Sequence, residues 1–135
     1  MSNFASDGNL IDDLAQFNLQ HEIAASEKKK PWPSGIYAET LFKKQDFRVV
    51  LIAMEKAAKM KEHHADGTIS VQVVKGHIRF HTKGQTHELQ AGHLLTLGAS
   101  IKHDVESLED SAFLLTIAWP CNQELLKMQH RGYGS

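Results

Sequence analysis

The chain has a single cysteine and almost no net charge, and each absence excludes a class of protein. Cys121 alone cannot close an internal disulfide, and one thiolate cannot form a zinc site made of several cysteines. The 15 Lys and Arg residues against 16 Asp and Glu residues give a formal net charge of −1, which argues against a nucleic-acid-binding face. The one basic run, Lys28–Lys30, lies between Glu27 and Pro31 and is typical of a solvated linker.

Long apolar runs are absent as well. No window approaches the roughly 18 consecutive apolar residues that a membrane span needs. The first residues lack the basic start and apolar stretch of a secretory signal. We therefore expect an intracellular, cytoplasmic protein that contacts no membrane. The length of 135 residues, of which 41% are apolar, suits one folded domain.

The first part of the chain has the pattern of an amphipathic helix followed by a linker. Apolar residues recur at helical spacing from Leu10 to Phe17, and Asn9 is a suitable N-cap, so we expect a helix over residues 10–25. A Pro-Trp-Pro segment then interrupts regular structure, since proline neither continues a helix nor enters a central strand. Residues 1–35 are accordingly predicted to be a helix and its linker.

From Ile36 onward the hydrophobic period becomes that of a β-strand. Turn residues, mostly glycines, recur about every 8–12 residues, which is typical of an all-β sandwich or closed barrel. We predict an all-β jelly-roll barrel, or double-stranded β-helix, over residues 36–120, and a tail with a short helix over residues 121–135. The expected strands are 36–43, 46–54, 68–74, 77–82, 85–89, 94–97, 101–107 and 112–119, and the short helix is 123–129.

Seven of the nine histidines lie in the middle of this strand-rich region, and strand parity indicates which of them face inward. His103 shares one strand face with Ile101 and Val105, which places it inside the barrel. His77 and His81 alternate with apolar residues and are therefore expected on the outside.

The adjacent His63 and His64 point to opposite faces if they lie on a strand. Counting from Met60 as a core residue places Glu62 and His64 inside. A β-bulge would reverse this choice and place His63 inside instead. Parity alone leaves both alternatives open.

Two stretches of the chain resemble the sequence motifs of the cupin superfamily. Residues 62–76, EHHADGTISVQVVKG, have the length and the closing hairpin of the first motif. Residues 92–103, GHLLTLGASIKH, look like the second motif and end at the position of its histidine. The resemblance covers about residues 47–119 and implies a cupin barrel.

In cupins, two histidines and a glutamate of the first motif join the second-motif histidine around a divalent metal. The resemblance thus implies Fe, Mn, Ni, Cu or Zn, metals that suit imidazole and carboxylate ligands. Counting back from Gly76 places Ile69 where the motif has its glutamate, and an apolar wall there suits an organic ligand. The candidate metal ligands are His63, His64 and His103. The candidate ligand-binding residues are Glu62, Ile69 and Met60.

Two functions follow from these residues. The first is a cupin that binds a divalent metal, a small molecule, or both. The second is a metal-free sensor or binding module without catalysis. No Ser-His-Asp or Cys-His arrangement is visible, so no catalytic residue is assigned. The amphipathic helix and the apolar strand at 47–54 lead us to expect a homodimer.

Overall fold

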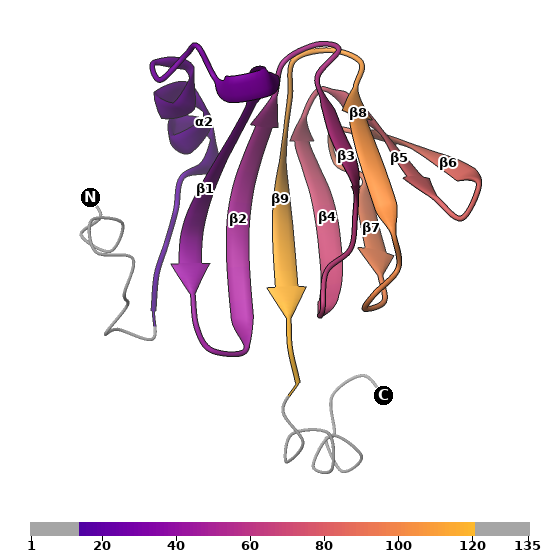
Figure 1. The fold of residues 1–135 in the computed structure, drawn as a ribbon. Helices are drawn as coiled ribbons and strands as arrows, with labels where there is room; N and C mark the ends of the chain where they lie inside the picture. Colours follow the sequence, from indigo (N-terminus) through magenta and orange to yellow (C-terminus); the bar gives the residue numbers. More distant parts are fainter. Residues whose placement is uncertain (1–13, 121–135) are drawn as a thin grey trace.

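Two antiparallel β-sheets form a jelly-roll barrel in the computed structural model, which describes residues 14–120 (Figure 1). The larger sheet has the strand order β1-β2-β9-β4-β7, and the smaller one has the order β3-β8-β5-β6. The strands within the described range are β1 (Ile36–Lys43), β2 (Phe47–Met54), β3 (Lys59–His63), β4 (Thr68–Lys75), β5 (His77–Thr82), β6 (Gln85–Gln90), β7 (Leu94–Leu97), β8 (His103–Ser107) and β9 (Ser111–Ala118). The predicted all-β class and barrel are confirmed.

Each of the eight predicted strands is present, with ends that differ from the prediction by at most two residues. The additional strand is β3, a five-residue strand at an edge of the smaller sheet. It pairs with β8 and consists mostly of exposed charged residues, so it carries little of the apolar alternation by which a strand is recognised.

The helix prediction is wrong at its start. The helix α2 (Leu19–Glu27) begins after Asn18, whose side chain accepts a hydrogen bond from the backbone N–H of His21 at 3.1 Å and so caps the first turn. Residues 14–18 are not helical. The proposed cap Asn9 and the predicted C-terminal helix lie outside the described residues. No helix among residues 14–120 is long and apolar enough to cross a membrane.

The apolar residues form two layers. One fills the space between the sheets, and its fully buried members include Phe80 and Phe113. The other lies on the outer face of the larger sheet, where Trp32 and the α2 segment cover Leu51. The Trp32 indole Nε1 donates a hydrogen bond to the carbonyl of Ser26 at 3.0 Å, which fixes α2 and the short 3-10 helix η1 (Pro33–Gly35) against the barrel. The chain itself covers this face of β2, and the dimer stays a prediction.

One end of the barrel, which we call the serine end, is closed by a buried polar network. Ser111 Oγ accepts the backbone N–H of His77 at 2.9 Å and lies 3.0 Å from Ser107 Oγ. Both hydroxyls are within hydrogen-bond distance of the Glu109 carbonyl. Gly76 packs so tightly here that a Cβ atom would lie 2.3 Å from Ser111 Oγ. This end therefore has no room for a further side chain.

Candidate functional site

The opposite end of the barrel, which we call the histidine end, brings two imidazoles together. His63 of β3 pairs with His103 of β8 after a register shift that follows Met60. The two rings meet edge to face, with centroids 4.3 Å apart. His103 is buried and stacks on Phe80 at 5.0 Å, as its strand parity predicts. The register shift thus sets His63 rather than His64 against His103, although the His63 side chain is exposed.

Both imidazoles are held by the same local hydrogen bond. His63 Nδ1 lies 2.7 Å from the Lys61 carbonyl, and His103 Nδ1 lies 2.9 Å from the Ile101 carbonyl. Because a carbonyl oxygen only accepts, each Nδ1 carries the proton. In the neutral rings, each Nε2 is therefore an unprotonated acceptor. Such a nitrogen accepts a hydrogen bond from a ligand O–H or N–H group, or binds a metal ion.

The surroundings favour the neutral form of His103. Burial lowers the pKa of this imidazole below its ordinary value of 6.5, because the charged ring would lose hydration. The nearby His63 also lowers the pKa, while the hydrogen bond to the Ile101 carbonyl raises it. His103 is consequently neutral at pH 7, and its Nε2 keeps its lone pair.

The other predicted site residues are distributed around this pair. His64 is half-exposed, and its Nε2 lies 4.0 Å from a carboxylate oxygen of Asp66. Ile69 is buried in the core between the sheets. Glu62 is exposed and Met60 is partly buried, and both line a hollow described below. The structure brings His63 and His103 together and leaves the remaining four apart from that contact.

The metal centre implied by the cupin resemblance requires more ligands than this pair supplies. Protein metal sites of the expected kind use at least three side-chain ligands. Among residues 14–120, no group of three or more His, Cys, Asp or Glu side chains is arranged to hold a metal ion. The described residues, as they are arranged here, therefore do not fit the metal ion that the cupin resemblance implies.

Arg48 is a residue of this end that the sequence reasoning missed. Strand pairing sets Arg48 of β2 beside Ile117 of β9, Ile117 beside Ile69 of β4, and Ile69 beside Leu97 of β7. The three apolar members of this row pack into the core between the sheets. The guanidinium carbon of Arg48 lies 5.3 Å from the centre of the Trp119 ring. Its Nε is buried and has no hydrogen-bond partner among the described residues.

A sequence signal for Arg48 exists in the alternation along β2. Val50, Ile52 and Met54 share its parity, and all three contribute to the core between the sheets. The segment is apolar at nearly every position after Arg48, which makes the alternation along it hard to recognise. A charged residue in phase with three core residues is the observation that indicates an inward arginine.

A sequence-family comparison identifies the group to which the barrel belongs. The model of the AraC-like ligand-binding domain matches residues 49–126, more than half of the chain. The chain is a cupin of the AraC-like ligand-binding family. No curated protein shows significant similarity to this cupin.

Solved structures agree on the fold. A conserved protein of unknown function from Streptococcus pyogenes is 19% identical, with a TM-score of 0.66 over 84% of this chain and 94% of that one. A cupin superfamily protein from Desulfitobacterium hafniense is 12% identical, with a TM-score of 0.63 over 67% and 83% of the two chains. An RmlC-like cupin from Shewanella frigidimarina is 18% identical, with a TM-score of 0.61 over 67% and 82%. These likenesses show the cupin fold.

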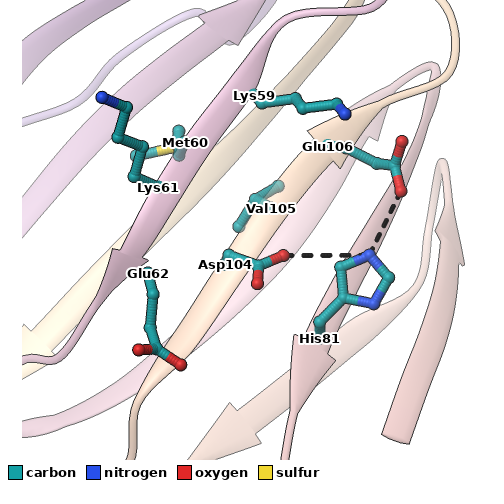
Figure 2. A pocket seen from close by; sticks show the side chains of 8 residues that line it. All are labelled: Lys59, Met60, Lys61, Glu62, His81, Asp104, Val105 and Glu106. Carbon is teal, nitrogen blue, oxygen red and sulfur yellow. Dashed lines mark hydrogen bonds and ion pairs between the residues drawn. The ribbon is translucent and has the colours of Figure 1, made fainter. Parts of the chain in front are cut away.

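A second feature of this cupin is a hollow of about 430 Å³ along β3, β8 and β5. In Figure 2, His81 points toward the carboxylates of Asp104 and Glu106. His81 Nε2 lies 3.2 Å from Glu106 Oε1 and 3.8 Å from Asp104 Oδ1. The residues that line the hollow are Lys59, Met60, Lys61, Glu62, His81, Asp104, Val105 and Glu106.

The charges on this outer face are paired with one another. Arg79 Nε donates to Glu88 Oε2 at 2.8 Å, and His77 contacts the other oxygen of the same carboxylate. The hydrogen bond from Arg79, followed by that from His77, lowers the pKa of Glu88 below its ordinary value. His77 and His81 thus lie outside the barrel as predicted, and each contacts a carboxylate there.

Proposed function

We propose that this cupin is a binding module that takes up a small organic molecule at the histidine end of its barrel. The observation that carries the proposal is the pair of fixed Nε2 acceptors on His63 and His103. The match to the AraC-like ligand-binding domain over residues 49–126 supports it.

The chemistry of this end indicates what kind of molecule fits. The two imidazoles accept hydrogen bonds, so the ligand presents O–H or N–H donors to them. Ile69, Leu97 and Ile117 form an apolar row on the facing sheet, which suits a hydrocarbon portion of the ligand. Mostly apolar walls with a few fixed polar groups are the usual composition of a small-molecule site.

The test is a titration of untagged protein with a panel of small hydroxylated compounds, followed by a melting-temperature shift. We expect His63→Ala to weaken binding about tenfold or more, since two hydrogen-bonded contacts to the ligand depend on this pair. His64→Ala is the matched control, because its ring is half-exposed and adjacent in sequence. Equal binding by the wild type and the His63 variant would overturn the proposal.

The alternative function is a cupin with a divalent metal on His63, His64 and His103, which requires His64 to move from its position beside Asp66. The same free Nε2 atoms favour it, since a metal-binding histidine commonly holds its other ring nitrogen in a hydrogen bond to a carbonyl. Elemental analysis of untagged protein beside His103→Ala separates the two functions. A near-stoichiometric metal that disappears in the variant, and in His64→Ala, supports the metal site and contradicts the metal-free module.

A further inference from the structure

Arg48 occupies the inner face of the larger sheet, at the end where the imidazoles lie. Its parity is that of Val50 and Ile52, which contribute to the core between the sheets. Its strand neighbour Ile117 belongs to the same core and pairs with Ile69 near the start of β4. The arginine therefore extends a row that is otherwise apolar and inward-facing.

Two contacts connect this row to the histidine pair. The loop that follows His63 leads to Gly67, where an added Cβ would lie 2.4 Å from the Ala118 carbonyl and 3.0 Å from the Trp119 ring. The Arg48 guanidinium lies over that same Trp119 ring. The loop that leaves His63 and the Arg48 guanidinium thus both contact Trp119, which places Arg48 at the histidine end.

The guanidinium is held in position and yet incompletely bonded. Its stacking over Trp119 restricts the orientation of the planar guanidinium group. Its Nε is buried, and among the described residues no acceptor reaches it. Arg79 on the outer face gives the contrast, because its Nε donates to Glu88 at 2.8 Å. A buried donor without a partner costs free energy, so a fold retains it where a bound molecule supplies the acceptor.

We propose that Arg48 receives the carboxylate of the bound molecule, so that this cupin binds small hydroxylated organic acids. The inference rests on the proposed binding function and adds the chemical class of the ligand. A guanidinium fork matches the two oxygens of a carboxylate. Packed sheets lie about 10 Å apart, so a molecule that spans Arg48 and the imidazoles carries its hydroxyl or N–H group several bonds away from its carboxylate.

The experiment compares acids with their neutral amides. Wild-type protein is titrated with 6-hydroxyhexanoate and 4-hydroxyphenylacetate, and with the primary amide of each. We expect the acids to bind about tenfold or more tightly than the amides, the ratio typical of a charge-assisted bidentate contact. Arg48→Met keeps the length and apolar contact of the side chain, and it is expected to remove this discrimination. Lys43→Met is the matched control, because Lys43 is the exposed strand partner of Arg48.

The outcomes separate this inference from the proposed function. If acids and amides bind equally, and His63→Ala weakens both, the binding function stands and the role of Arg48 is wrong. If neither series binds, or if binding ignores His63, both proposals fail. If Lys43→Met weakens acid binding as much as Arg48→Met does, the preference arises from general surface charge and the inference fails. Urea unfolding of each variant confirms that the fold is intact.

Discussion

The two ends of the barrel differ in how completely their polar side chains are hydrogen-bonded. At the serine end, Ser107 and Ser111 bond to each other, to a carbonyl and to a backbone N–H, so the network is closed. At the histidine end, His63 and His103 use one ring nitrogen locally and present the other, while Arg48 keeps a buried donor without a partner among the described residues. The closed network contributes to stability at one end, and the incompletely bonded groups lie at the end where we propose that the ligand binds.

This difference indicates which amino-acid substitutions in this cupin should affect folding and which should affect binding. A closed polar network in a tightly packed region loses stability when any member changes. At the histidine end, removing the Arg48 Nε donor breaks no hydrogen bond to a described residue, so a smaller loss of stability is expected there. The following predictions test this division, beginning with the largest effect.

Gly76→Ala is expected to be the most destabilising change. Gly76 has φ +88, and a Cβ there would lie 2.5 Å from the Asp110 carbonyl oxygen, which is backbone and cannot move aside easily. We expect a loss of about 3 kcal/mol in the free energy of unfolding, measured by urea denaturation. Gly84→Ala is the control: its φ is +77 but no atom lies within 4 Å of the added Cβ, so about 1 kcal/mol is expected. Equal losses would contradict the tight packing of the serine end.

Ser111→Ala tests the polar network itself. Without the hydroxyl, the backbone N–H of His77 loses its acceptor. We expect the free energy of unfolding to fall by about 1–3 kcal/mol. Ligand affinity at the other end should stay unchanged, and a titration of the same variant measures it. A variant that loses affinity while keeping its stability would break the comparison between the ends.

The smallest effect concerns pH and the histidine end. Burial lowers the folded-state pKa of His103 below 6.5, so the unfolded chain binds a proton at this position first as the pH falls. The contribution of the neutral ring to stability is fully present above about pH 6.5 and decreases as the pH falls toward the lowered pKa.

His103→Gln should flatten this part of the stability profile, as measured by urea unfolding between about pH 5 and pH 8. The exposed His93 provides the control substitution, His93→Gln. A slope that persists in the His103 variant and disappears in the His93 variant would show that another group causes the pH dependence.

Most of the strand content was predictable, because period-two alternation and turn residues are local signals. The start of α2 at Leu19 was not, since Asn18 lies inside a run of helical spacing and its role as a cap depends on packing. Phe17 and Leu19 pack on the outer face of the larger sheet, which is a contact between distant parts of the chain. Propensity and spacing carry no information on such a contact.

The candidate site shows the same division between what local sequence predicts and what depends on contacts between distant parts of the chain. The inward position of His103 follows from its own strand, and the structure agrees. The choice between His63 and His64 depends on a register shift between β3 and β8, which involves two strands. The inward position of Arg48 also follows from its own strand, but its place beside Ile117 follows only from the pairing of β2 with β9. Local parity thus finds single residues, while the assembled site needs the order of strands in the sheet.

The register shift after Met60 affects how the protein tolerates an insertion or deletion near the adjacent histidines His63 and His64. β3 lies at the edge of its sheet, where a strand has one neighbour and its register is least constrained. A slip of one residue there would move His63 away from His103 and bring His64 into its place. Either register would therefore set an imidazole opposite His103.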